Sequence, residues 1–572
     1  MAYDVVVRNG TVADGTGGPL RAADVAVVGG RIAVVGENVG RGEREIDAEG
    51  ALVAPGWVDV HTHYDGQVTW DRHLAPSAWH GVTTVVMGNC GVGFAPVHPQ
   101  DHDRLIALME GVEDIPGTAL HEGLPWDWES FPDYLHALAR REWDADVAAQ
   151  LPHAPLRVHV MGERGANREP ATSEEIATMA RLAGEAVRAG ALGFTTSRSL
   201  NHRTADGDPI ATLTASAEEL AGIAQGMGGG VLQLLSDFED LDAEWATVRG
   251  MVERSGRPLS FTVVTVLHAC ERAGRLLDLI DAARVDGLPM TAQVAPRAIG
   301  LLFGLSCTMH PFLANPFWQE AGLGAMPPAR QVAELRRPDV RDKLLAAHVA
   351  RFDPRNPLGG GLSGRFDVMY EFADPPDYDP DPATNVAARA AARGVEPHVL
   401  ALDMLTADDD GTAMLYMPYF NFRAADGIGV CREMLAHPYA VPGLSDGGAH
   451  AGTICDGSYP TFLLQHWGRD RGAFGFEWIV ERQCRATARL VGLNDRGVLA
   501  PGYRADVNVI DVDRLALPRP EVHHDLPAGG RRLLQRAVGY RHTFVAGVET
   551  YRDGVPTGAT PGRLVRGARP PN

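Results

Sequence analysis

Two histidines near the start of the chain have the residue type and spacing of a metal site. His61 and His63 follow a short apolar run and the turn Pro55-Gly56-Trp57, a context that predicts a strand ending in a polar loop. Residues i and i+2 of a strand point to the same face, so both imidazoles would aim at one point. Imidazole is a ligand for zinc, iron, nickel and similar ions. The tripeptide alone fits equally well with two hydrogen-bonded histidines on a half-buried strand.

The composition excludes several classes of protein. The 572 residues exceed one ordinary domain and suit a large barrel with additions. Hydrophobic residues make up 45% and charged residues 22%, which is typical of a soluble globular protein rather than a disordered one. The formal net charge of −21 would repel a phosphate backbone and therefore argues against nucleic-acid binding. The sequence has no apolar run of membrane-spanning length and no signal-peptide pattern, so we expect no membrane partner and a cytoplasmic location.

The six cysteines are scattered and form no Cys-x-x-Cys pair. Their spacing predicts neither a disulfide framework nor a zinc finger. Most of them are expected to be small core residues. Cys90 differs because it lies at the end of a predicted strand, which makes it a further candidate ligand.

Strand and helix patterns indicate how these residues are positioned. Residues 1–55 have the pattern of short strands with glycine turns, and this pattern returns after residue 490. Between them, strands alternate with helices. The predicted strands are residues 81–90, 190–196, 230–235 and 259–264, and a helix is predicted over 173–188 with Ser173 as its N-cap.

Repeated strand–helix units predict an α/β fold with a parallel sheet, for which a closed (β/α)8 TIM-like barrel is the favoured architecture. The predicted barrel covers residues 56–489. Residues 1–55 and 490–565 are expected to form one small β-sandwich domain from both termini. Residues at about 300–400 are rich in proline and aromatic side chains and predict an insertion over one face of the barrel.

Several segments together resemble the amidohydrolase superfamily, and the resemblance covers nearly the whole chain. The segments that carry it are 55–63, Gly81-Val82-Thr83-Thr84, Leu444-Ser445-Asp446 and 499–506. Within the superfamily, the chain is most similar to the D-aminoacylase group, the N-acyl-D-amino-acid deacylases. That closer similarity is carried by Gly88-Asn89-Cys90-Gly91 and by residues 109–116 and 123–128.

The resemblance implies a metal-dependent hydrolase of a linear amide C–N bond in a small-molecule substrate. The residues matching His61 and His63 bind metal in the family, zinc being the expected ion. The aspartate matching Asp446 binds metal and moves a proton from water to the leaving amine. In the deacylase group a cysteine matching Cys90 replaces a carboxylated lysine as a ligand. The sequence leaves open whether the protein forms a homo-oligomer.

The chain departs from the family pattern at two predicted strand ends. The family usually has a histidine at the end of the fifth strand and another at the sixth, but residues 233–238 and 261–266 contain none. His268 lies beyond the second segment and is expected on the surface. We therefore predict a single ion held by His61, His63, Asp446 and Cys90.

A second departure concerns the substrate. D-aminoacylases bind the substrate carboxylate with an arginine just after the matching aspartate, whereas residues 447–456 contain no arginine. Near predicted strand ends, several cationic or imidazole side chains are candidates for substrate contacts, each with an ordinary surface or ion-pair role as the alternative. These candidates are Arg198, Arg203 and Arg297 for a carboxylate, and His202 and His450 for a tetrahedral intermediate.

Two other functions remain open on the sequence. One is a hydrolase of the same fold that acts on cyclic or aryl amides, and the other is a non-catalytic descendant that keeps the fold for assembly. The retention of His61, His63 and Asp446 argues against the second. Residues 443–447 also match Gly-x-Ser-x-Gly, but a serine-hydrolase elbow requires a helix directly after the serine, and Gly447-Gly448 opposes one.

Overall fold

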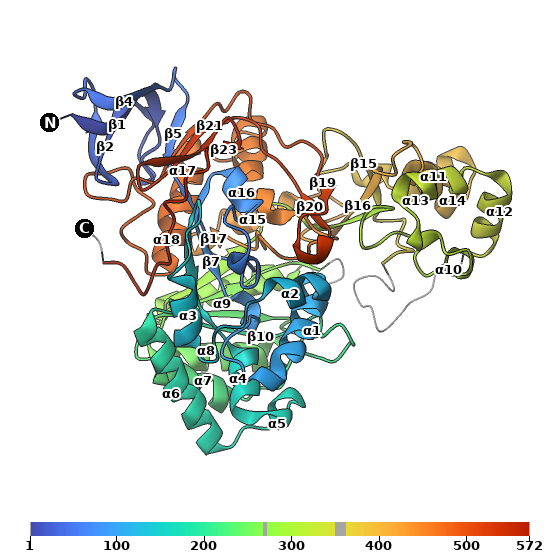
Figure 1. Cartoon of the computed structure of the whole chain (residues 1–572), viewed down its shortest axis with the longest axis horizontal. Coiled ribbons are helices and arrows are strands. Elements are labelled where there is room, and N and C mark those ends of the chain that lie inside the picture. Colours follow the sequence, from blue (N-terminus) through green and yellow to red (C-terminus); the bar gives the residue numbers. More distant parts are fainter. Residues whose placement is uncertain (1, 267–270, 349–361, 571–572) are drawn as a thin grey trace.

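Strands from both ends of the chain form one nine-stranded sheet (Figure 1). The computed structural model describes residues 2–266, 271–348 and 362–570. The strands run in the order β23-β22-β21-β18-β5-β1-β2-β3, and β4 pairs with β1. The N-terminal members are β1 (Tyr3–Val12), β2 (Arg21–Val28), β3 (Arg31–Gly36), β4 (Gly42–Asp47) and β5 (Leu52–Pro55). The C-terminal members are β18 (Val507–Ile510), β21 (Tyr540–Val545), β22 (Val548–Arg552) and β23 (Val555–Pro556).

Alternating valines explain why this sheet has an apolar face. Val5 and Val7 of β1 and Val25 and Val27 of β2 are buried, and they share one apolar cluster with Phe544 of β21. The antiparallel pairing of β5 with β18 joins the N-terminal and C-terminal halves. The sheet therefore ties the two terminal parts of the chain together.

Between the termini, the strands are parallel and almost fully buried. Two sheets have the orders β6-β7-β8 and β17-β13-β12-β11-β10-β9. Their bounds are β6 (Trp57–Asp59), β7 (Val82–Met87), β8 (Asp146–Ala149), β9 (Leu151–Pro152), β10 (Gly193–Arg198), β11 (Val231–Ser236), β12 (Leu259–Thr262), β13 (Met290–Val294) and β17 (Ala440–Pro442). The four predicted strands are confirmed as β7, β10, β11 and β12. Buried on both faces, such strands need the continuous apolar runs seen in the sequence.

The two parallel sheets meet at both ends. A single residue, Gln150, separates β8 from β9 along the chain. On the other side, a parallel bridge links Thr62, which follows β6, to Gly447, which follows β17. The carboxyl ends of β6 and β17 are therefore neighbours, although 385 residues separate Thr62 from Gly447 in the sequence.

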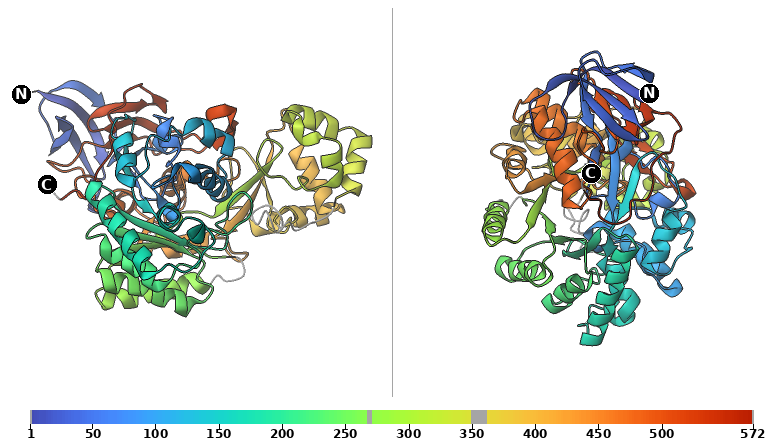
Figure 2. Two further views of the ribbon diagram at one scale, coloured as in Figure 1. Left: turned by 60° about the horizontal axis from the view of Figure 1, so that its bottom comes forward. Right: turned by 90° about the vertical axis from the view of Figure 1, so that its left-hand side faces the viewer.

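Helices connect the parallel strands, and α6, α7 and α8 pack side by side along them (Figure 2). The helices of this part are α1 (His102–Glu113), α2 (Gly117–Gly123), α3 (Phe131–Leu138), α4 (His153–Met161), α5 (Glu163–Ala166), α6 (Ser173–Ala189), α7 (Ala217–Gly226), α8 (Leu241–Ser255), α9 (Glu271–Val285) and α15 (Gly429–Leu435). Three shorter helices precede the final strands, namely α16 (Tyr459–Phe462), α17 (Phe476–Val480) and α18 (Thr487–Leu490). No helix among the described residues has the length and apolar character to cross a membrane.

The N-cap of α6 differs from the prediction by one residue. Thr172 caps the helix, because its hydroxyl accepts from Glu175 N while the Glu175 carboxylate accepts from Thr172 N at 2.7 Å. This reciprocal capping box requires an acid three residues after the cap. Ser173 is followed at that distance by Ile176, which cannot return the hydrogen bond, so the sequence prediction of Ser173 was wrong.

The segment between β13 and β17 has its own sheet and helices and extends to one side of the molecule (Figure 1). Its antiparallel sheet has the order β14-β16-β15, and an apolar cluster including Phe312, Trp318 and Leu400 fills its interior. The strands are β14 (Ile299–Gly304), β15 (Tyr370–Phe372) and β16 (Met414–Phe420), and the helices are α10 (Pro316–Glu320), α11 (Pro328–Leu335), α12 (Pro338–Ala346), α13 (Val386–Arg393) and α14 (Pro397–Leu405). A short hairpin, β19 (Glu521–His523) with β20 (Arg532–Leu534), completes the described strands.

Candidate metal centre

Four side chains from three strand ends converge at the carboxyl edge of the parallel strands. His61 and His63 follow β6, Cys90 follows β7 and Asp446 follows β17. His61 Nε2 lies 3.2 Å from Cys90 Sγ and 3.4 Å from Asp446 Oδ1, and His63 Nε2 lies 3.6 Å from the same Asp446 oxygen. The structure thus brings together all four residues predicted as metal ligands.

Second contacts aim both imidazoles at this point. His61 Nδ1 is 2.7 Å from Gln293 Oε1, an acceptor that fixes the proton on Nδ1 and leaves Nε2 free to coordinate. His63 Nδ1 lies 3.2 Å from Glu113 Oε1, at the end of α1. A carboxylate or amide oxygen behind a histidine ligand is the usual way in which a protein orients such a ligand and raises its basicity.

The geometry and the donor set fit a cation. Asp446 Oδ1 is buried and has no hydrogen-bond donor among the described residues, although it faces two imidazole nitrogens. Zinc ligands lie about 2.0–2.3 Å from the ion, so the corners of a tetrahedral site are about 3.3–3.8 Å apart. The ligand atoms of His61, His63 and Cys90 lie within 4.8 Å of one another, and no other group of three such residues in the described chain does so.

Burial and neighbouring charges set the protonation of these groups. Burial lowers the pKa of His61 to about 4, which keeps the imidazole neutral as a ligand must be. Burial also lowers the pKa of His63, but Glu113 and Asp446 outweigh it and raise that pKa well above its usual value. Burial raises the pKa of the Cys90 thiol to about 11, so the thiolate needs a cation beside it to form at neutral pH.

Cys90 sits in a turn that only its glycine neighbours permit. Cys90 and Asp446 both have left-handed backbones, with φ of 54° and 48°. A Cβ on Gly88 (φ 82°) would lie 2.2 Å from Gln150 O, so this residue must be glycine. Cys90 N donates to Gln233 Oε1 at 3.1 Å, which anchors the turn to β11, one of the strands where the family has a histidine.

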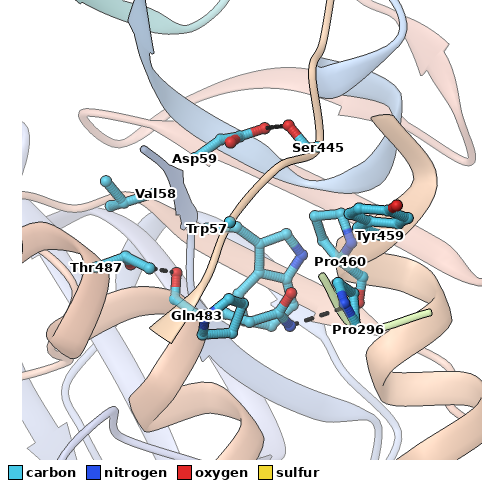
Figure 3. A pocket seen from close by; sticks show the side chains of 11 residues that line it. Trp57, Val58, Asp59, Pro296, Ser445, Tyr459, Pro460, Gln483 and Thr487 are labelled. Carbon is cyan, nitrogen blue, oxygen red and sulfur yellow. Dashed lines mark hydrogen bonds between the residues drawn. The ribbon is translucent and has the colours of Figure 1, made fainter. Parts of the chain in front are cut away.

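The Ser445 hydroxyl holds the last strand end against the first. It donates to Asp59 Oδ2 (Figure 3). It also lies 3.2 Å from His61 O. Asp446 N donates to His61 O at 3.1 Å and His63 N donates to Gly447 O at 2.8 Å. Ser445 has no histidine partner among the residues that the structure describes, and the residues directly after it form no helix. In the segment that matches Gly-x-Ser-x-Gly, the serine therefore joins two strand ends. Its surroundings are not those of a serine nucleophile.

A cavity of about 440 Å³ opens from the four ligands. His202 and His450 line it, as expected for candidate substrate contacts. Burial lowers the pKa of His202 to about 3 and that of His450 to about 4, so both imidazoles are neutral at pH 7. His450 Nε2 lies 3.9 Å from Asp446 Oδ2 and 3.7 Å from Glu113 Oε2.

The arginines predicted to bind a substrate lie elsewhere. Arg198 forms a bidentate pair with Glu244, and Arg297 is fully enclosed with Asp456 at 2.7 Å and the Tyr378 ring. Arg203 donates to backbone carbonyls of its own loop. None of the three lines the cavity, so the structure does not bring Arg198 or Arg297 together with the four candidate ligands. The groups that these arginines bind are distant in the sequence or belong to loops, and no pattern in the sequence indicates them.

His268, which was expected on the surface, lies outside the described residues.

Glu113 and Gln293 are site residues that the sequence reasoning did not identify as such. Glu113 belongs to the segment 109–116 that carried the resemblance, and it ends α1 three residues before Pro116. The motif therefore pointed to the position of Glu113, but it did not indicate the role of the side chain. Gln293 sits near the end of β13, where a polar residue inside an apolar strand was a usable signal.

The contact between Glu113 and His63 gives a testable prediction. We expect Glu113→Gln to weaken zinc binding by about 10- to 100-fold, because the carboxylate behind His63 is lost while the ligand remains. Zinc affinity is measured by competition with a chromophoric chelator. The matched control is Glu122→Gln, which removes the same charge from an exposed position on α2. Equal zinc affinities for Glu113→Gln and the parent protein would contradict an orienting role.

The chain is similar to known proteins over nearly its whole length. A sequence model of the amidohydrolase family matches residues 44–554. The D-aminoacylase of Alcaligenes xylosoxydans xylosoxydans is 28% identical over 569 residues, covering 98% of this chain and 97% of that protein. The N-acyl-D-glutamate deacylase of the same organism is 27% identical over 578 residues, covering 98% of this chain and 96% of that protein.

A solved structure shows the same mixed α/β fold. The crystal structure of N-acyl-D-glutamate deacylase from Bordetella bronchiseptica, complexed with zinc and a phosphonate inhibitor, has a TM-score of 0.66 at 24% identity. The superposition covers 99% of this chain and 100% of that chain. Since the family match spans most of the 572 residues, the resemblance seen in the motifs is confirmed, and the chain belongs to the amidohydrolase family.

Proposed function

We propose that this protein is a metal-dependent hydrolase of linear amide C–N bonds, with an N-acyl-D-amino acid as substrate. The observation that carries the proposal is the buried Asp446 Oδ1, which has no hydrogen-bond donor within the described part of the chain and faces His61 Nε2 and His63 Nε2 beside the Cys90 thiol. The near full-length similarity to a D-aminoacylase and an N-acyl-D-glutamate deacylase supports the choice of substrate.

Within this site, His61, His63, Cys90 and Asp446 are the residues that would hold the ion. A bound zinc ion supplies a Lewis acid at the scissile carbonyl and lowers the pKa of water. Asp446 Oδ2 accepts the proton of the attacking water and returns it to the leaving nitrogen. His450, neutral and 3.9 Å from that oxygen, positions the carboxylate and contacts the developing negative charge.

A single ion per chain belongs to the same proposal. Two metals would need further ligands at the ends of β11 and β12. Gln233, in the middle of β11, is used by the Cys90 turn. Thr262, at the end of β12, has a hydroxyl that is a poor ligand for zinc. Asp237 is bound by Ser199 and by Leu200 N at 2.7 Å each. Zinc is favoured over other divalent ions because a thiolate and two imidazoles suit it best.

The finer architecture follows the same reasoning. We propose that β6, β7, β8 with β9, β10, β11, β12, β13 and β17 are the eight strands of a closed barrel, supported by the strand order and the bridge between Thr62 and Gly447. We propose a small β-sandwich domain from residues 1–55 and 490–565, with the barrel over 56–489. The segment 299–420 is then the insertion expected at about 300–400.

The test combines a metal count with a substrate panel. Purified protein is analysed for zinc, and zinc-loaded protein is assayed on N-acyl-D-amino acids, their L-isomers, and cyclic amides such as imides and hydantoins. We expect one tightly held ion and hydrolysis of the N-acyl-D-amino acids. Preferential hydrolysis of cyclic amides would show that the substrate is a cyclic amide and not an N-acyl-D-amino acid. If the fully loaded protein hydrolysed no compound, a non-catalytic role would be favoured. Two tightly held ions would contradict the single-ion site.

A further inference from the structure

Arg272 is an arginine inside the cavity that no family motif indicates. It is the second residue of α9, in the connection that follows β12, and its side chain is half-buried. It lines the same cavity as His61, His63 and Asp446. No other lysine or arginine lines this cavity in the described part of the chain.

With respect to the described residues, the Arg272 guanidinium retains donors that its contacts do not use. Nη1 donates to the backbone carbonyl of Asp237 at 2.6 Å, and no described carboxylate forms an ion pair with the group. Arg198 and Arg297, by contrast, are each paired with a carboxylate. Guanidinium has five N–H donors in a planar fork that matches a carboxylate, so the one backbone contact fixes Arg272 without occupying its fork.

Apolar side chains make up much of the wall of this cavity. Leu276 lies one helical turn further along α9, and Val264, Leu301 and Phe420 also line the space. The other charged groups in the lining are acids, including Glu113 and Glu239. An apolar substrate with one carboxylate matches this distribution, whereas a second carboxylate on the substrate would meet acidic side chains without a cation.

We propose that Arg272 binds the free carboxylate of the substrate, and that the substrate is the N-acyl derivative of an apolar amino acid. This inference rests on the proposed function. Arg272 then takes the place of the arginine that is missing after Asp446, from a different strand connection. It is a specificity-determining residue that selects the acid over neutral amides and takes no part in proton transfer.

The experiment compares an acid with its neutral isostere on zinc-loaded protein. We expect kcat/KM for N-acetyl-D-leucine to exceed that for N-acetyl-D-leucinamide by about 30- to 100-fold, as a charge-assisted bidentate contact allows. Arg272→Met should remove this ratio by lowering the value for the acid only, and Arg272→Lys should restore part of it. The matched control is Arg275→Met, exposed on the same helix, which should leave the ratio unchanged.

Each outcome decides the inference. A parent protein that hydrolyses both compounds equally, or an Arg272→Met variant that loses both activities alike, would overturn the assignment while leaving the amide hydrolase intact. If the parent protein hydrolyses neither compound, the proposed function fails, and calorimetric binding of N-acetyl-D-leucine decides instead. Binding that is lost in Arg272→Met and retained in Arg275→Met supports carboxylate recognition, and absent or unaltered binding overturns it.

Discussion

Asp446→Asn is expected to lower kcat/KM for the best N-acyl-D-amino acid by at least about 1,000-fold. The amide keeps the shape of the side chain but cannot accept a proton from water, and general-base catalysis contributes about 10²–10⁴-fold. Neighbouring imidazoles outweigh burial and hold the pKa of Asp446 below its usual range, so the parent carboxylate is ionised at neutral pH and ready to accept a proton. Steady-state kinetics at saturating zinc measure the effect.

Asp446→Asn could lower activity either because the protein loses zinc or because it loses the general base, so the two effects are measured separately. Zinc content is therefore determined for Asp446→Asn under the assay conditions, where His61, His63 and Cys90 still supply three ligands. Asp410→Asn is the matched control, because it makes the same substitution at an exposed position outside the cavity. We expect it to stay within about threefold of the parent protein. An Asp446→Asn variant that binds zinc and stays within tenfold of parent activity would exclude Asp446 as the base.

Local periodicity was sufficient to predict the pair of histidines but not the site around it. His61 and His63 are two residues apart, so strand geometry alone aims them together. Asp446 is 385 residues from His61, and its role came from the resemblance. The structure supplies the physical connection, because the bridge from Thr62 to Gly447 and the Ser445 contact to Asp59 place the two strand ends side by side.

Contacts that depend on tertiary packing could not be predicted in this way. Arg297 lies near a strand end, as a substrate-binding arginine would, yet it is buried against Asp456 and Tyr378. Arg272 lies in the connection after β12 and lines the cavity, although its sequence surroundings are those of an ordinary helix start. Which arginine keeps free donors is decided by partners distant in the chain, and a single sequence does not reveal those partners.

Cys90→Ser is expected to weaken zinc binding by more than about 100-fold. Loss of a contact behind a ligand already costs about 10- to 100-fold, and here the ligand atom itself changes from a thiolate to a neutral hydroxyl. Cys90 is 4% exposed and the two side chains have nearly the same shape, so the fold should persist. Chelator competition measures the affinity, and cobalt-substituted protein should lose its sulfur-to-metal charge-transfer absorption.

Cys307→Ser is the matched control for this substitution. Cys307 is as buried as Cys90, at 3% exposure, but it does not line the cavity. We expect it to keep the parent zinc affinity and the charge-transfer band. If Cys90 were only a buried thiol at a strand end, both serine variants would bind zinc alike and the cobalt spectrum would show no sulfur band in the parent protein. Since burial raises the pKa of Cys90 to about 11, a thiolate signal at neutral pH would show that a cation lies against the sulfur.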